Sequence, residues 1–247
     1  MDEEKLLTDR FRELSQRAET RNCRTFSEFL SLSEQGILQR APLASSFSLV
    51  GGYDSAERRI AVFTGSDCYY EEEPPIRCVE MKPLSQKFAD ALSHRDFLGS
   101  LMALGIRREL LGDILIHENV GYLFCLASIS DFLIASLTKV RHTDVVCSVV
   151  DAPPSATTVL PDPTRIVVSS ERLDALIAAA FKLSRSEAQE LFKKEKVFVN
   201  GKLIQCDSDS PKSNEIVSVR GLGRFLYEGV SGETKKGRLT ASVRIFK

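Results

Sequence analysis

The chain has 247 residues, of which 43% are apolar, and its formal net charge is −1 at neutral pH. This length and apolar content support two or three domains with hydrophobic cores, and the near-zero net charge argues against indiscriminate binding of nucleic acid. The charges are nevertheless uneven, because residues 165–247 hold sixteen Lys and Arg against ten Asp and Glu, whereas residues 1–164 are acidic. A basic C-terminal third on an acidic body indicates a localised anionic partner.

Cysteine spacing and hydropathy exclude several classes of protein. The six cysteines form no CxxC pair, which argues against a metal cluster and against a disulfide framework. The first residues are charged, and no segment approaches the roughly 18 consecutive apolar residues of a transmembrane helix. The sequence therefore predicts a cytoplasmic protein that binds no metal and no membrane.

Residues 1 to about 40 are expected to be helical. Four apolar residues fall on one stripe of a helix: Leu7, Phe11, Leu14 and Ala18. Residues 25–28, Thr-Phe-Ser-Glu, have the spacing of a capping box, in which a hydroxyl and a carboxylate cap the first turn reciprocally. A second helix is therefore expected to begin there and to run to about residue 32.

Residues 47–50 and 59–63 predict an antiparallel pair of strands. Gly51 and Gly52 predict a turn region between them, because neither GxGxxG nor GxxxxGK[ST] is present to indicate a phosphate loop. The segment 69–75 is acidic and contains two prolines, which is typical of a domain boundary.

From residue 76 to about 150 the patterns predict the order strand, helix, strand, strand, helix, strand, which is that of a ferredoxin-like or RRM-like fold. The strands are expected at residues 76–81, 112–117, 121–127 and 145–150, and the helices at about 93–104 and 130–137. The third strand of an RRM presents aromatic side chains on which bases stack. Tyr122 and Phe124 share one face of the corresponding strand, so they either stack on RNA or fill a core.

The sequence contains three histidines and one His-Arg-Asp triplet that are candidates for catalytic groups. The triplet His94-Arg95-Asp96 occurs in the catalytic loop of kinases, but that loop needs Asn five residues after the Asp, and position 101 is Leu. His94 is therefore interpreted as a helix-start residue. His117 and His142 are isolated in the sequence, so neither a triad nor a metal site is indicated.

The basic C-terminal third begins with two expected helices. Four apolar residues line one face of the first: Leu173, Leu176, Ile177 and Ala180. Residues 184–187, Ser-Arg-Ser-Glu, have the spacing of a capping box that would open the second helix, which should turn Ala188, Leu191 and Phe192 inward.

A small sheet is expected after these helices. Residues 197–199 and 202–204 predict a hairpin, because Asn200 and Gly201 both tolerate the positive φ of a tight turn. Further strands are expected at 215–219, 223–230 and 238–246. The prolines of residues 152–164 predict a semi-extended linker before this region.

This C-terminal region resembles an S4 RNA-binding domain, the αL-type motif. The resemblance lies in Arg172-Leu173-Asp174, in Ser184-Arg185-Ser186 with Ala188, and in residues 197–201. Arginine offers a two-pronged contact to phosphate, and a helix N-terminus favours an anion. The expected RNA ligands are Arg172, Ser184, Arg185, Ser186, Lys193, Lys194, Lys196, Lys202, Arg220 and Arg224. A second RNA surface is expected at His94, Arg95, Arg107, Arg108, Tyr122 and Phe124.

The chain as a whole resembles the YlmH family of bacterial S4-domain proteins, which is associated with cell division and with ribosome-associated quality control. The resemblance adds three motifs to the S4 region: GGYDSAERR from Gly51, HRDFLG from His94 and LGIRRELLGDI from Leu104. It implies an α+β protein with an N-terminal helical and β-hairpin domain (1–75), an RRM-like domain (76–151), a linker (152–164) and an S4 domain (165–247). It also implies binding to the large ribosomal subunit, through rRNA or tRNA, and help in elongating the tail of a stalled nascent chain, without catalysis, cofactor or small-molecule substrate.

Two other functions remain open at this point. S4 domains often accompany pseudouridine synthases, so an rRNA-modifying enzyme is an alternative, with Asp96 and Asp113 as the candidate catalytic carboxylates. The acidic N-terminal body would also suit a protein–protein adaptor of the division machinery.

Overall fold

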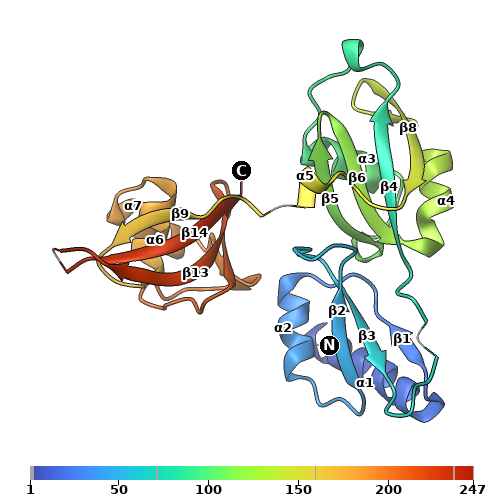
Figure 1. The fold of residues 1–247 in the computed structure, drawn as a ribbon, viewed down its shortest axis with the longest axis horizontal. Helices are drawn as coiled ribbons and strands as arrows, with labels where there is room; N and C mark the ends of the chain where they lie inside the picture. The colour runs from blue at the N-terminus through green and yellow to red at the C-terminus, as the bar shows by residue number, and fades with distance from the viewer. Residues whose placement is uncertain (1–2, 71, 159, 236, 247) are drawn as a thin grey trace. The chain divides into compact units, whose positions relative to one another are not determined.

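The computed structural model describes residues 3–70, 72–158, 160–235 and 237–246 (Figure 1). Within these residues the fold mixes helices with antiparallel strands in three sheets. The chain divides into two compact units, Met1–Val159 and Leu160–Lys247, called here the N-terminal and the C-terminal unit. The finer domain division expected from the sequence stays a prediction.

The first part of the N-terminal unit is a three-stranded antiparallel sheet with two helices. Its elements are α1 (Glu3–Arg21), β1 (Arg24–Phe26), α2 (Leu32–Arg40), β2 (Ser46–Val50) and β3 (Ile60–Thr64), in the strand order β1-β3-β2. The pairing of β2 with β3 confirms the strand pair predicted from the sequence. Phe11 and Leu14 of α1 and Leu38 of α2 are buried in one cluster with Phe63 of β3.

The capping box expected at residues 25–28 is wrong, because this segment enters β1 and pairs with β3. The Thr25 hydroxyl donates to the Leu14 carbonyl at 2.9 Å instead of capping a helix. The capping box lies at the start of α2, where the Ser31 amide donates to the Glu34 carboxylate at 2.6 Å. Both tetrapeptides have the same spacing, so strand pairing rather than the local pattern decides between them.

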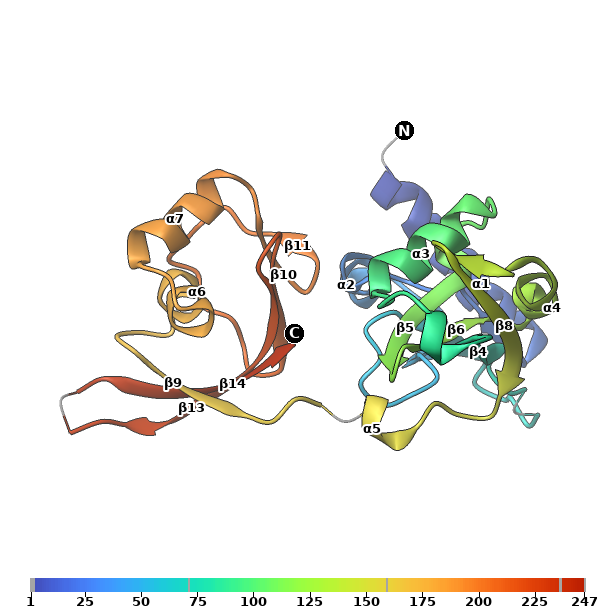
Figure 2. The ribbon, with the colours of Figure 1, turned by 90° about the horizontal axis from the view of Figure 1, so that it is seen from above.

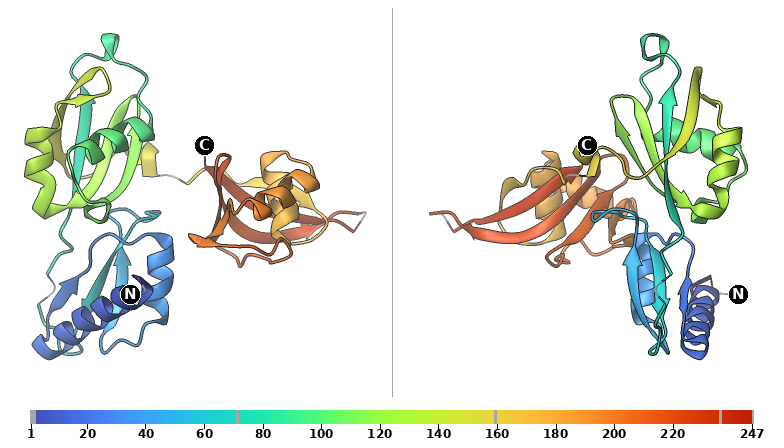
Figure 3. Two further views of the ribbon diagram at one scale, coloured as in Figure 1. Left: turned by 180° about the vertical axis from the view of Figure 1, so that it is seen from behind. Right: turned by 45° about the vertical axis from the view of Figure 1, so that its right-hand side comes forward.

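The second part of this unit is a five-stranded antiparallel sheet. Its elements are β4 (Ile76–Pro83), η1 (Gln86–Phe88), α3 (His94–Ala103), η2 (Arg108–Leu110), β5 (Leu111–His117), β6 (Val120–Leu126), α4 (Ala127–Ser136), β7 (Lys139–Val140) and β8 (Thr143–Val150). The strand order is β5-β6-β4-β8-β7, and the short β7 was not expected from the sequence. Phe97 and Leu101 of α3 and Leu133 of α4 are buried in one cluster with residues of the sheet. The two helices lie on one face of the sheet (Figure 3).

The opposite face of this sheet is covered by the first part of the unit around β6, whereas Lys82 of β4 and Val146 and Ser148 of β8 on the same face are exposed. Tyr122 and Phe124 of β6 are only 6% and 2% exposed, in a cluster with Phe29 and Ile60. The Phe124 ring also stacks on Tyr53, with 5.1 Å between the ring centroids. Of the two roles that the sequence left open for these aromatics, the structure shows core filling, and neither ring presents a free face to bases here.

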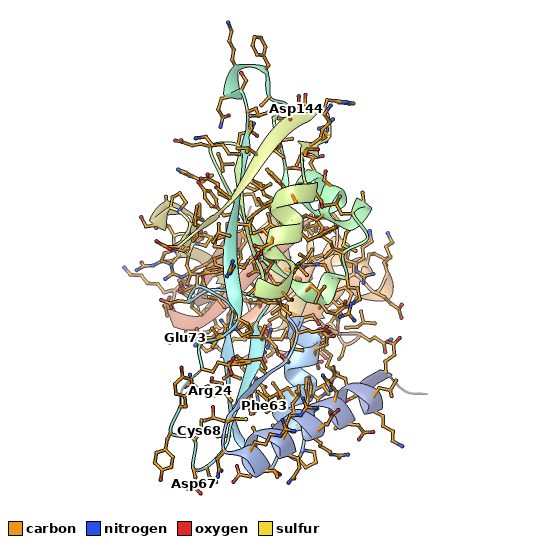
Figure 4. All side chains as sticks on the ribbon, turned by 90° about the vertical axis from the view of Figure 1, so that its right-hand side faces the viewer. Arg24, Phe63, Asp67, Cys68, Glu73 and Asp144 are labelled. Atoms are coloured by element: carbon orange, nitrogen blue, oxygen red, sulfur yellow. The ribbon has the colours of Figure 1, made fainter. Side chains whose placement is uncertain are left out.

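The segment that joins the two sheets runs past the edge of the first. In Figure 4, Arg24 at the start of β1 lies between the labelled Cys68 and Glu73. Its guanidinium donates to the Glu72 carbonyl at 3.2 Å. The proline-bearing segment is therefore anchored to β1.

The expected linker is not extended throughout. Residues 155–158 form the single-turn helix α5 (Ser155–Thr158). The Ser55 hydroxyl donates to the Thr158 carbonyl at 3.2 Å, so this turn is held by the loop between β2 and β3.

The C-terminal unit is a six-stranded antiparallel sheet with two helices. Its elements are β9 (Thr164–Val168), α6 (Leu173–Phe181), α7 (Arg185–Lys193), β10 (Val197–Val199), β11 (Lys202–Leu203), β12 (Glu215–Val219), β13 (Gly223–Glu233) and β14 (Leu239–Phe246), in the strand order β11-β10-β12-β13-β14-β9. Leu176 and Phe192 of the helices share one buried cluster with Phe225 and Tyr227 of β13, so the helices cover one face of the sheet (Figure 2). The β10–β11 hairpin turns at Asn200 and Gly201, which both have the positive φ predicted for them.

Two cysteines of the second sheet are buried as thiols. Burial raises the pKa of Cys78 and of Cys125 to about 12, so both remain neutral thiols at physiological pH. Among the described residues, no helix has the length and apolar character needed to cross a bilayer.

Candidate nucleic-acid interface

Two short helices meet at residues that the sequence predicts to bind RNA. α6 is followed by its C-cap Lys182, whose backbone is left-handed (φ 56°), and α7 is preceded by its N-cap Ser184. The Ser184 amide donates to Glu187 Oε2 at 2.8 Å and the Glu187 amide donates to Ser184 Oγ at 3.3 Å, which confirms the capping box. These hydrogen bonds from Ser184 lower the pKa of Glu187. The N-terminus of α7 therefore already holds a carboxylate, which competes with phosphate at the site expected for Ser184 and Ser186.

A buried aspartate joins the two helices. Asp174, in the first turn of α6, has no exposed surface, and its carboxylate accepts hydrogen bonds from Arg172 Nε (3.2 Å), Arg185 Nε (2.9 Å) and Gln189 Nε2 (3.3 Å). Burial alone would raise the pKa of Asp174, but the hydrogen bonds and charges of Arg185 and Arg172 outweigh it, and the pKa is lowered. The ionised carboxylate thus fixes α6 against α7.

The two arginines at Asp174 are not equivalent as RNA ligands. Arg172 donates also to Asp207 at 3.2 Å, and its side chain is 35% exposed, so its guanidinium is largely engaged inside the unit. Arg185 uses Nε alone, and its side chain is 52% exposed. In the part of the chain that the structure describes, its terminal nitrogens have no hydrogen-bond partner, so Arg185 keeps donors for a phosphate.

Lysines at the end of α7 and in the hairpin form the most exposed part of the predicted edge. The exposed members are Lys193, Lys194 and Lys202. Lys193 forms an ion pair with Glu190 at 2.6 Å, which raises the pKa of Lys193. Lys196 is half-buried, and its carbonyl accepts from the Arg220 amide at 2.9 Å, so the backbone of Arg220 lies beside the turn between α7 and β10.

Arg220 and Arg224 lie over aromatic rings on the outer face of the sheet, away from α6 and α7. The guanidinium carbon of Arg220 is 4.6 Å from the centroid of the Phe198 ring, and that of Arg224 is 4.7 Å from the centroid of Phe246. The register pairs Phe198 with Ser218, Ser218 with Arg224, and Arg224 with Phe246, so these side chains form one row across the strands. A guanidinium stacked on a ring is held in plane while its N–H edge remains a donor.

Sequence reasoning missed Phe198 and Phe246 as partners of these arginines. The available signal was the alternation of β10, since Val197 is buried and Phe198 must then point to the opposite face. A large aromatic residue on the outer face of a strand, near an arginine, indicates a ring that holds a cation.

In the expected second RNA surface, Arg108 is turned inward. Its guanidinium donates to the Leu111 carbonyl at 2.7 Å, and burial together with the charge of Arg58 lowers the pKa of Arg108 to about 10. His94, at the start of α3, lies near enough to Arg108 that desolvation and this charge lower the pKa of His94. The guanidinium of Arg108 therefore stabilises the fold and is not presented to an external anion.

The other members of that surface are divided between solvent and core. Arg107 is 63% exposed but forms an ion pair with Glu28. Arg95 is exposed on α3. Since Tyr122 and Phe124 are buried and Arg108 is turned inward, the members of this set at the surface are His94, Arg95 and Arg107.

Asp113 is held by the loop between β2 and β3. Its Oδ2 accepts from the Tyr53 hydroxyl (2.8 Å) and the Glu57 amide (2.7 Å), and its Oδ1 accepts from the Arg58 amide (3.2 Å). Desolvation raises the pKa of Asp113 although the Tyr53 and Arg58 hydrogen bonds oppose the shift. Two of the sequence motifs, GGYDSAERR and LGIRRELLGDI, thus meet at one carboxylate.

Asp96, the other carboxylate considered for catalysis, caps α3. Its Oδ2 accepts from the Ser93 amide at 2.8 Å and from the Ser93 hydroxyl at 2.6 Å, which lowers the pKa of Asp96. Asp96 and Asp113 are both engaged in local structure.

Comparisons with known proteins agree with the motifs. A family model described as "Putative RNA-binding domain in YlmH" matches residues 71–152. The ribosome-associated protein quality control protein P2 of Bacillus subtilis is 33% identical over 223 residues, which cover 86% of this chain and 83% of that protein. The solved structure of the cell division protein ylmH from Streptococcus pneumoniae is similar over 64% of this chain and 96% of its own, with 21% identity and a TM-score of 0.49. Because the relative from Bacillus subtilis aligns over most of both chains, the chain belongs to the YlmH family.

Proposed function

We propose that this protein binds RNA of the ribosome through its C-terminal unit and acts in ribosome-associated quality control. The name of the Bacillus subtilis relative supplies the biological setting, and the family description supplies the RNA. The observation that carries the proposal is the edge formed by the end of α7 and the β10–β11 hairpin. There Lys194, Lys196 and Lys202 form no ion pair within the described residues, so their charges are available to phosphates.

The proposal includes two domain types. The C-terminal unit would be an S4 domain, supported by two helices with a confirmed capping box followed by a hairpin with an Asn-Gly turn. The second part of the N-terminal unit would be RRM-like, supported by the β5-β6-β4-β8 order, in which the first strand of the motif lies between the third and the fourth.

The residues of the edge divide into contacting and positioning groups. Arg185 would bind phosphate with its terminal nitrogens, whereas Arg172 would keep Asp174 ionised and the helices in place. Each phosphate that the lysines neutralise should add about 0.7–0.9 to the slope of log affinity against log salt. Arg220, held on the Phe198 ring, would add a preorganised donor at the same end of the sheet.

The same proposal extends to the partner and the process. The large ribosomal subunit with its tRNA would be the partner in the cytoplasm, and the bound protein would help to elongate the tail of a stalled nascent chain. No catalytic step is included. This is supported by the engagement of Asp96 as a helix cap and of Asp113 with Tyr53 and two backbone amides.

Co-sedimentation with purified large ribosomal subunits tests the proposal. The triple variant Lys194→Gln, Lys196→Gln, Lys202→Gln should lose about tenfold or more in affinity and should show a shallower salt dependence. The matched control Lys5→Gln, Lys82→Gln, Lys87→Gln removes the same charge from exposed lysines of the N-terminal unit. An equal loss of affinity in both variants would mean that net charge, and not this edge, determines binding. Binding that survives nuclease and high salt would mean that the protein is a protein–protein adaptor and does not bind through RNA.

A further inference from the structure

The part of the chain matched as RNA-binding lacks the surface that such folds normally offer. RRM-like folds bind bases on the open face of the sheet. Here that face holds Phe124, stacked on Tyr53, and a Cβ at Gly52 would come within 2.3 Å of the Phe124 ring. This packing excludes stacking of bases on Tyr122 and Phe124, so a contact with RNA in this region needs residues other than these aromatics.

A groove lies on the helical side of the same sheet, between α3 and the segment that runs from the end of α4 through β7 to Arg141. Its volume is about 580 Å³. It is lined by Arg95, Asp96, Gly99 and Ser100 from α3 and by Lys139 and Arg141 from the β7 region. With three cations against one carboxylate, the groove suits an anionic ligand.

The cations of this groove are only loosely engaged. Arg141 Nε lies 3.7 Å from Asp96 and Lys139 Nζ lies 3.4 Å from Asp144, and both basic side chains are at least half exposed. Arg95 is exposed and forms no ion pair among the described residues. Such solvent-screened pairs contribute little to stability, so a phosphate could replace the carboxylates at small cost.

Gly99 has no explanation inside the fold. It lies in the middle of α3, where glycine destabilises a helix relative to other residues. A Cβ built at Gly99 meets no atom within 4 Å, so neither packing nor a positive φ requires glycine there. Glycine at position 99 therefore lowers helix stability without relieving any clash in the fold. Because this position lies on the wall of a cationic groove, the missing side chain would let the backbone of a bound ligand come close to α3.

We propose that a sugar–phosphate backbone lies in the α3–β7 groove, with Arg95, Lys139 and Arg141 contacting phosphates and Gly99 allowing the strand to approach the helix. This rests on the proposed function, since it names a second place where the same RNA-binding protein touches RNA. It assigns the contact to the helical face of the fold and not to the sheet.

The sharpest test fills the groove without changing charge. Gly99→Gln in the full chain should leave α3 intact or more stable, because glutamine is the better helix former. It should nevertheless weaken binding of fluorescein-labelled bacterial ribosomal RNA by roughly threefold to tenfold, since each lost phosphate contact costs a few-fold in affinity. The matched control is Gly36→Gln in α2, where a Cβ meets only Arg40 Nη1 at 3.8 Å. Weaker binding by Gly99→Gln alone, with the melting temperature maintained, supports the proposal; unchanged binding overturns it.

A charge test separates this inference from the proposed function. Arg95→Gln with Arg141→Gln should weaken RNA binding and lower the salt slope by about 1.4–1.8 for two phosphates. Arg12→Gln with Arg40→Gln, exposed arginines of α1 and α2, should not. If the C-terminal lysine triple variant weakens RNA binding but the groove variant binds RNA as well as its control, the inference about the groove is wrong and the proposed function stands. If neither variant weakens binding, the proposed function fails as well.

Discussion

Asp113 and Asp174, one in each unit, show two ways in which this molecule uses a carboxylate near arginines. Asp174 is completely buried, yet arginine side chains hydrogen-bond to it and its pKa is lowered. Asp113 accepts from a tyrosine and two backbone amides, and desolvation raises its pKa. Desolvation and nearby arginines act on both carboxylates in opposite directions. At Asp174 the hydrogen bonds and charges of Arg185 and Arg172 outweigh desolvation, whereas at Asp113 desolvation outweighs the hydrogen bonds and charges that oppose it.

The exposure of the partners also decides what each carboxylate does for the molecule. Around Asp113 the arginines are turned inward: Arg58 donates to the Phe29 and Leu111 carbonyls and Arg108 to Leu111. Around Asp174, Arg185 remains 52% exposed. The arginines near Asp113 thus hold segments of the N-terminal unit together, whereas Arg185 at Asp174 presents a cation at the surface.

The largest effect is expected from Asp113→Ala. The Tyr53 hydroxyl and two amides would lose their acceptor, and Arg58 and Arg108 would lose one of the carboxylates that offset their mutual repulsion. We expect a loss of about 3 kcal/mol in the free energy of unfolding of the N-terminal unit. Hydrogen exchange of β5 and residues 51–59 in the full chain measures this loss. Asp9→Ala, which removes the partner of exposed Arg12, should change it by less than about 0.5 kcal/mol.

Asp174→Ala should destabilise less, although Asp174 is the more buried residue. Its partners Arg172 and Arg185 are 35% and 52% exposed, so water can solvate them after the change, and we expect about 2 kcal/mol. Because Arg185 would lose its anchor, RNA binding should also weaken, which we do not expect for Asp113→Ala. A larger loss for Asp174→Ala in hydrogen exchange of α6 and α7 would break the comparison.

Features of the fold could be predicted from the sequence where they depend on residues close together in the chain. The capping box at Ser184 and the turn at Asn200 were predictable because each depends on a few neighbouring residues. The same spacing failed at Thr25, since its pairing with Phe63 of β3, 38 positions along the chain, overrides it.

The same distinction between local and long-range interactions applies to the candidate site. Its exposed lysines follow from composition and helix position. The pairing of Arg172 with Asp207, and the burial of Tyr122 and Phe124, required knowledge of segments distant in the chain. Those are tertiary contacts, and no local pattern encodes them.

Acid should affect the two aspartates in opposite directions. The pKa of Asp174 lies below its unfolded value of about 3.9, so its stabilisation is present above that pH and is lost as pH falls through the folded pKa. The pKa of Asp113 is raised, so its protonated form is favoured by folding, and that contribution is present below about pH 3.9 and is lost as pH rises through the folded pKa. Carbon-13 NMR titration of the two carboxyl groups measures both values directly. Equal pKa values, or the reverse order, would contradict the roles assigned here.

The smallest expected effect concerns an arginine held by a ring instead of a carboxylate. Phe198→Leu keeps an apolar side chain under Arg220 but removes the π face, so the guanidinium should lose about 0.5–1 kcal/mol of attraction. Since Phe198 is half-buried, the melting temperature should change little, and the effect should appear as a roughly twofold loss of RNA affinity. The same change at Phe246, beneath Arg224, is the matched comparison, because both arginines were expected to bind RNA. If neither variant alters affinity while Asp174→Ala does, the carboxylate-held Arg185, and not the outer face of the sheet, provides the arginine contact to RNA.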